Sequence, residues 1–171
     1  MNNKLLGLIG FLTLTAASAQ AAGGMGSVGA QIGWGIPNET GVTGGLNFGV
    51  TGEYNLAPTI AVGAYLSYQM MGLDPEQTGV SLYSLPMGAT VNWYAMPELY
   101  LGANAGIVMG VQSDGTDSTT ASDISFGGQV GYDFPINAQM SVGAEGKYIY
   151  IMTEGDAGSL IQANAQFKFM F

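Results

Sequence analysis

Cysteine and histidine are both absent from this chain of 171 residues. Without cysteine, neither a disulfide framework nor a thiolate metal site can form. Without histidine, the commonest general base and the commonest zinc ligand are also missing. Charged residues make up only 9% of the sequence, against roughly 25% in soluble domains. This low charge, together with a mean hydropathy of +0.26, indicates a membrane protein.

Long hydrophobic runs are missing as well. After residue 22 no segment reaches the 18 or more consecutive apolar residues of a transmembrane helix. Basic residues are scarce, and the formal net charge of −9 argues against a nucleic-acid partner. If the chain crosses a membrane, it therefore has to cross it with strands.

The N-terminus has the features of a signal peptide over residues 1–22. Lys4 lies before an apolar stretch of ten residues, 5–14, which is too short to span a bilayer. Small residues offer two cleavage positions, after Ala19 or after Ala21. An N-terminal anchor helix is the alternative. We expect the mature domain to occupy residues 23–171.

Alternation of apolar and polar residues with period two runs through the rest of the chain. In 46–55, for example, Leu46, Phe48 and Val50 oppose Asn47, Gly49 and Thr51. Eight segments of about 10–14 residues sort in this way, which is long enough for tilted strands to cross a bilayer. The segments are 27–36, 46–55, 60–70, 81–94, 99–112, 123–134, 140–152 and 160–171. The pattern predicts an all-β fold, an eight-stranded antiparallel up-and-down transmembrane β-barrel.

The connections between these segments are of two kinds. Three are short and each contains a proline, at Pro58, Pro97 and Pro135. The other four are longer and rich in Gly, Asp, Thr and Ser, and they cover 37–44, 71–79, 113–122 and 153–159. Short periplasmic turns and longer outer loops are typical of outer-membrane barrels. An even number of strands places both termini at the periplasmic end.

Aromatic residues gather near the two ends of the predicted strands. Tyr54, Trp93 and Phe134 end strands that head for the periplasm, whereas Trp34, Tyr68, Tyr83 and Tyr150 lie toward the loops. Amphipathic rings prefer the two membrane interfaces, so we expect two aromatic belts.

A soluble eight-stranded barrel of the lipocalin kind is the structural alternative, because it also alternates. It would need an apolar interior and a well-charged exterior. The polar face here is mostly Gly, Ser, Asn and Gln, which suits a narrow lumen better than a soluble surface.

The only cations after the N-terminus are Lys147 and Lys168, and both fall on the polar face of their strands. A lysine inside a barrel needs an acceptor. Glu53 and Glu145 lie on inward faces too, so we expect a luminal charge network of these four residues. If the last hairpin folds about 153–159, Glu145 faces Lys168 and Lys147 faces Gln166; a register displaced by two residues is the alternative. Solvation of each lysine near a barrel end is the alternative.

Other acidic residues cluster in the long loops, where they serve solubility. The segment 114–123, DGTDSTTASD, offers carboxylates, but it lacks the turning glycine and the terminal glutamate of an EF-hand loop. We therefore predict no metal site and no cofactor.

At this point the chain resembles the small eight-stranded outer-membrane barrels of Gram-negative bacteria, such as the OmpA membrane domain, OmpX and "porin family" barrel proteins. In that family the last strand carries a signal for the barrel-assembly machinery, with a terminal aromatic and alternating apolar residues before it. Phe171, Phe169, Phe167 and Asn164 fit this signal, while a glycine usual at the place of Gln166 is missing. The resemblance implies a multi-pass barrel in the bacterial outer membrane, with its lipids and the assembly machinery as partners.

Fold does not fix function. We expect a non-enzymatic protein with a structural or interaction role through short acidic extracellular loops, whose extracellular ligand the sequence does not name. The alternative is a narrow passive conduit for water, ions or small molecules. Related barrels that are enzymes use histidine, so we predict no catalytic site here.

Overall fold

The computed structural model describes residues 26–38, 41–73, 81–113, 118–153 and 157–171. The predicted signal peptide, at residues 1–22, lies outside the described residues. Within the described part no helix is long and apolar enough to cross a membrane.

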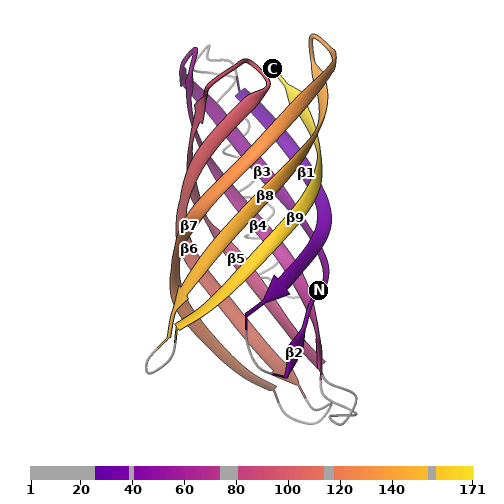
Figure 1. Ribbon diagram of the computed structural model, residues 1–171, viewed down its shortest axis with the longest axis vertical. Helices are drawn as coiled ribbons and strands as arrows, with labels where there is room; N and C mark the ends of the chain where they lie inside the picture. The colour runs from indigo at the N-terminus through magenta and orange to yellow at the C-terminus, as the bar shows by residue number, and fades with distance from the viewer. Residues whose placement is uncertain (1–25, 39–40, 74–80, 114–117, 154–156) are drawn as a thin grey trace, which may run out of the picture.

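Eight long antiparallel strands and one short strand form a closed barrel (Figure 1). The strands are β1 (Gly26–Pro37), β2 (Val42–Thr43), β3 (Gly45–Ala57), β4 (Ile60–Leu73), β5 (Ser81–Tyr94), β6 (Leu99–Ser113), β7 (Ser118–Asn137), β8 (Met140–Met152) and β9 (Ala157–Met170). Each long strand pairs with its neighbours in the chain, and β1 pairs with β9 to close the ring. The predicted all-β, eight-stranded antiparallel barrel is therefore confirmed.

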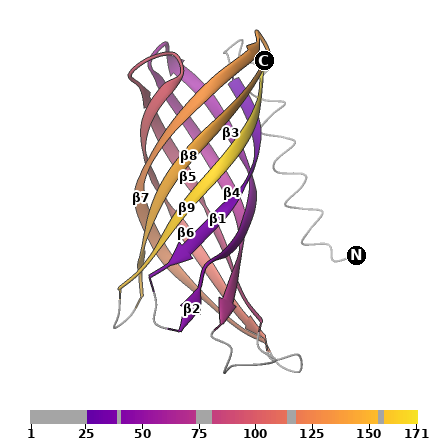
Figure 2. The same cartoon turned by 45° about the vertical axis from the view of Figure 1, so that its right-hand side comes forward.

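Both ends of the described chain lie at the end of the barrel that carries the three short turns (Figures 1 and 2). Gly26 and Phe171 exchange two backbone hydrogen bonds of 2.9 Å there. We call this the short-turn end, and the opposite end, where the other four connections lie, the loop end.

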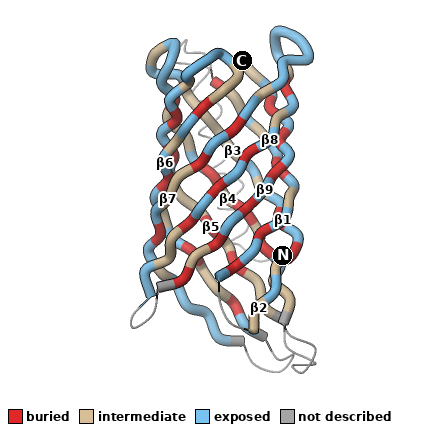
Figure 3. The backbone as a smooth tube through the Cα atoms, viewed as in Figure 1, coloured by how far each residue is buried: buried red, intermediate tan, exposed pale blue. Residues whose placement is uncertain are grey.

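The two faces of each strand differ in burial, as the alternation requires (Figure 3). Outward positions carry exposed apolar side chains such as Ile32, Phe126 and Ile161. Inward positions carry buried polar ones such as Asn47, Gln69 and Lys147. The interior is thus polar and the exterior apolar, which is the reverse of a soluble barrel.

Inward glycines let the narrow barrel close around its larger side chains. Gly131 on β7 lies directly opposite Tyr100 on β6, and a Cβ at Gly131 would collide with the Tyr100 ring. The outward Gly128 differs, because the nearest heavy atom to a Cβ there would be 3.6 Å away. Glycine is therefore required at position 131 and optional at position 128.

Two departures from the predicted segments concern the loop end. Strand β7 starts at Ser118, five residues before the predicted start, although 118–122 has no large apolar residue on either face. Apolar–polar alternation occurs only in the part of a strand that separates lipid from lumen. A strand end that extends beyond the membrane lacks this alternation, and the sequence pattern therefore predicts a loop there. The short strand β2, which pairs with the end of β4, also lies in a predicted loop.

Candidate functional site: the lumen and its two mouths

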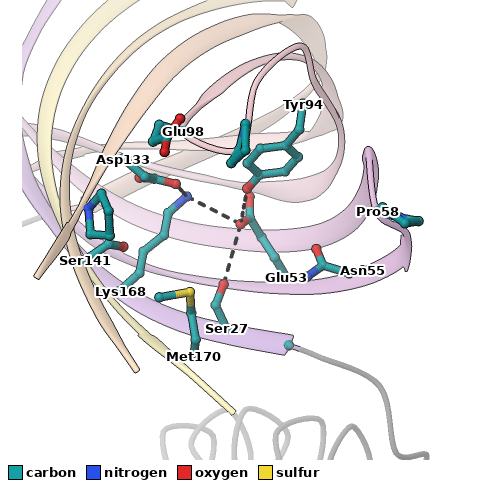
Figure 4. A pocket seen from close by; sticks show the side chains of 13 residues that line it. Ser27, Glu53, Asn55, Pro58, Tyr94, Glu98, Asp133, Ser141, Lys168 and Met170 are labelled. Carbon is teal, nitrogen blue, oxygen red and sulfur yellow. Dashed lines mark hydrogen bonds and ion pairs between the residues drawn. The ribbon is translucent and has the colours of Figure 1, made fainter. Parts of the chain in front are cut away.

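A group of side chains around Lys168 lies in the lumen near the short-turn end, and we call it the Lys168 cluster (Figure 4). Lys168 on β9 reaches Asp133 Oδ2 on β7 at 2.8 Å and Glu53 Oε2 on β3 at 3.4 Å. Tyr94 on β5 donates a hydrogen bond of 3.1 Å to Glu53, and Asn92 donates another. Because these strands are spread around the ring, the cluster ties the closing strand to the far wall.

A second group, the Lys147 cluster, lies deeper in the barrel. Lys147 Nζ is 3.2 Å from Glu145 Oε1 and 4.3 Å from the centre of the Tyr65 ring. Glu145 also accepts hydrogen bonds from the Tyr100 hydroxyl, at 3.0 Å, and from the Asn164 amide, at 3.4 Å. The side chains of Lys147 and Glu145 are only 1% and 3% exposed, so water contributes little to their solvation.

Tyr100 joins the two clusters. Lys168 Nζ lies over the Tyr100 ring, 4.6 Å from the ring centre. The Tyr100 hydroxyl accepts a hydrogen bond of 3.2 Å from the Gln166 side chain. Gln129 extends the polar layer across the lumen with a 2.7 Å bond to Asn92. Buried polar groups that are bonded in a continuous network order the interior more strongly than isolated pairs do.

An apolar layer lies on the loop-end side of the Lys147 cluster. It consists of Val108, Ile149 and Leu160, which are 5%, 0% and 1% exposed, with Ile151 packed against it. On β8 the inward residues run Glu145, Lys147, Ile149 and Ile151 toward the loop end. Lumen-facing side chains therefore change from charged to apolar along one strand.

Each mouth of the barrel keeps a cavity. The cavity at the short-turn end has a volume of about 360 Å³, and Glu53, Asp133 and Lys168 line it (Figure 4). The cavity at the loop end has a volume of about 120 Å³, and Val108 and Leu160 of the apolar layer line it. The apolar layer and both charged clusters thus lie between the two cavities.

The four residues predicted to form a luminal network, Glu53, Glu145, Lys147 and Lys168, all point inward, but their pairing differs from the prediction. Lys147 pairs with Glu145 of its own strand, and Lys168 pairs with Glu53 and Asp133. The predicted pairing of Glu145 with Lys168 is wrong, because Glu145 lies opposite Asn164, and Lys168 lies opposite Ser141.

The cause is the position of the last hairpin. Met152 pairs with Ala157, so β9 begins three residues before the predicted 160–171 segment and the register moves by four residues. An even shift leaves every side chain on its original face. The inward assignment of both lysines consequently survives an incorrect register.

Sequence reasoning missed Asp133, Tyr94 and Tyr100 as members of the network. Asp133 was a detectable member, because it lies on the polar face of 123–134. Tyr100 offered a weaker signal, as a large aromatic on a polar face. Among the described residues, no group of three or more His, Cys, Asp or Glu side chains is placed to hold a metal ion.

The predicted belt residues lie on the outer wall of the barrel. Trp34, Trp93 and Phe134 are 50%, 53% and 56% exposed. Tyr68 and Tyr83 stack with ring centres 5.2 Å apart, and Phe126 packs against Tyr150 at 5.1 Å. Tyr54 faces outward near the short-turn end of β3, opposite Gly26 of β1. Their contact with a membrane interface stays a prediction.

The four residues of the predicted assembly signal lie on β9 and just after it. Phe167 and Phe169 point outward, at 45% and 41% exposure, while Asn164 is buried in the lumen. Phe171 follows the strand, and its ring lies against Gly26. Recognition of this segment by an assembly machinery stays a prediction.

Comparison with known proteins settles the family. The model of the outer membrane protein beta-barrel domain family matches residues 5–169, which is nearly the whole chain. The chain belongs to this family. Among curated proteins, none shows significant similarity to it.

Three solved structures illustrate the shared fold. Neisserial surface protein A has a TM-score of 0.69 at 16% identity, covering 86% of this chain and 99% of that one. Ail of Yersinia pestis, solved with the heparin analogue sucrose octasulfate, has a TM-score of 0.63 at 15% identity, covering 86% and 99%. OprG of Pseudomonas aeruginosa has a TM-score of 0.57 at 11% identity, covering 86% and 96%. At these identities the likeness concerns the fold.

Proposed function

We propose that this family member is a non-enzymatic barrel of the bacterial outer membrane that does not conduct ions and acts through its loop end. The filled lumen carries the proposal. Two charged clusters and an apolar layer lie in series between the two cavities. Hydrophobic constrictions oppose ion passage because they shed water.

The two ends of the barrel support a proposed direction of insertion. Short turns and both described termini share one end, which in outer-membrane barrels faces the periplasm. The loop end then faces outward and presents the acidic connections, including Glu39, Asp74, Asp117 and Asp156 in the sequence.

Loop-end charge limits the class of partner. Ail was solved with a heparin analogue, a polyanion. This chain has a formal net charge of −9, and four acidic connections would repel such a ligand. We therefore favour a cationic or neutral partner over a heparin-like one.

Orientation can be tested with single cysteines, because the chain has none of its own. Thr153 is exposed at the loop end and Ala138 is exposed in the turn between β7 and β8. In intact Gram-negative cells a membrane-impermeant maleimide should label Thr153→Cys, and should label Ala138→Cys only after permeabilisation. The opposite labelling pattern, or a mature protein found soluble in the periplasm, would rule out the proposal.

The alternative is a passive conduit for water, ions or small molecules. The presence of a cavity at each end of the barrel favours it, and the layers between the cavities oppose it. Conductance across a planar bilayer separates the two functions.

A further inference from the structure

The loop-end cavity, called here the loop-end pocket, has walls of two kinds. Its apolar part includes Val108, Leu160 and Ile151, and Val108 and Leu160 also belong to the apolar layer. Its polar part includes Ser84 of β5 and Asp123 of β7, both at inward positions. A volume of about 120 Å³ lies below the roughly 300–1,000 Å³ of sites for drug-sized ligands, so it suits a smaller molecule.

Ser84 contributes to the wall of this pocket a hydroxyl that is unpaired within the described chain. The residue is only 2% exposed, and its hydroxyl has no hydrogen-bond partner among the residues that the structure describes. A buried hydroxyl without a partner is costly, and native structures rarely leave one so. A polar group bound in the pocket would satisfy it.

Asp123 sets the charge of that group. The two lysines of the described chain are engaged at other carboxylates, Lys147 at Glu145 and Lys168 at Glu53 and Asp133. The sequence contains no arginine or histidine that could neutralise Asp123 instead. A carboxylate beside an apolar floor favours a cation with an apolar body.

We infer that the loop-end pocket binds an alkylammonium group, with its apolar body on Val108 and Leu160 and its ammonium between Asp123 and Ser84. The ammonium donates hydrogen bonds to the carboxylate and to the Ser84 oxygen. The connections between strands at the loop end are acidic in sequence, and negative charge attracts cations. Since Val108 and Leu160 also form the floor, the ligand stops at the apolar layer and the pocket is a dead end.

This inference uses the proposed orientation only for access from outside, because binding is measured on refolded protein. The cysteine-labelling experiment tests the orientation of the barrel independently of ligand binding in the pocket. The titration described below tests ligand binding independently of the orientation of the barrel.

The probe is n-butylammonium chloride, added to the protein refolded in maltoside micelles whose Val, Leu and Ile methyl groups are labelled for NMR. We expect saturable shifts of the Val108, Leu160 and Ile151 methyl resonances, with a Kd on the order of 1 mM for so small a ligand. Asp123→Asn should weaken binding roughly tenfold or more, the value of one charge-assisted hydrogen bond. Ser84→Ala should weaken it by a smaller factor.

Glu98→Gln is the matched control, because it removes one carboxylate from the opposite mouth of the barrel. Its affinity should equal that of the unchanged protein. A second arm compares butylammonium with N-acetyl-lysine amide, which tells a free amine from the side chain of a protein partner.

Three results would overturn the inference. The first is the absence of saturable methyl shifts with both the free amine and the lysine derivative. The second is equal affinity for n-butanol, which would make the pocket merely apolar. The third is unchanged binding in Asp123→Asn.

Discussion

Lys168 is the strongest test of the luminal network, because one cation there serves two carboxylates. Replacing it with Met keeps the apolar stem but leaves Glu53 and Asp133 without their cation, while Asp133→Asn removes only one partner. Breaking a fully buried ion pair from one side costs about 3–5 kcal/mol. The carboxylates here are 11% and 14% exposed toward the short-turn cavity, so we expect about 2–3 kcal/mol for Lys168→Met and about 1 kcal/mol for Asp133→Asn.

The double variant should lose less than the sum of the two single losses, with a coupling of about 1–2 kcal/mol. The assay is urea unfolding of the protein in lipid vesicles. Asp133→Asn combined with Lys147→Met is the control, since Lys147 pairs with Glu145 instead, and its two losses should add. If the Lys168 and Asp133 losses added to within about 0.3 kcal/mol, the two residues would not meet and the observed register of β9 would have to be abandoned.

Other variants test separate parts of the structure. Gly131→Ala should lower the free energy of unfolding by about 1–3 kcal/mol in the same assay, since the new methyl group collides with the Tyr100 ring. Gly128→Ala, on the open outer face, should be neutral or stabilise the protein by up to about 1 kcal/mol. Equal effects of the two variants would contradict the assignment of faces. Leu160→Ala should cost about 2–5 kcal/mol, because Leu160 is 1% exposed in the apolar layer, and a loss below about 1 kcal/mol would mean that this layer is not packed. Deleting Phe171 should reduce membrane insertion in cells while leaving refolding in detergent nearly unchanged, and equal surface yields with and without the residue would refute its role as an assembly signal.

The sequence predicted correctly which side chains face the lumen, because the alternation of apolar and polar residues is a strong and local signal. Lys147 and Lys168 fall on the polar face whatever the register, and a lysine facing lipid near the midplane would cost about 2–4 kcal/mol. The prediction of an inward lysine needed only the parity of its position in the strand.

Pairing could not be predicted in the same way, because it depends on where a hairpin turns. The last hairpin turns between Met152 and Ala157, and the predicted centre lay two residues later. Polar and small residues continue past the turn into the start of β9, as Gly158 and Ser159, so composition does not mark the centre of the turn. Long-range partners such as Lys168 and Asp133, which are on non-adjacent strands, also depend on closure of the whole ring.

The apolar layer was missed for a related reason. Ile149 and Leu160 interrupt the polar face of their strands, so in the sequence they weaken the alternation. In the barrel they pack together with Val108. Only the assembled ring shows that such exceptions lie at one height.

Conductance of the refolded, unmodified protein in a planar bilayer tests the central claim, a closed lumen, most directly. We predict that the membrane current stays at the level of the protein-free bilayer, because ions cannot cross the apolar layer of Val108, Ile149 and Leu160. Reproducible unitary current steps from the unmodified protein, abolished by leaving the protein out, would contradict the closed lumen and favour the conduit.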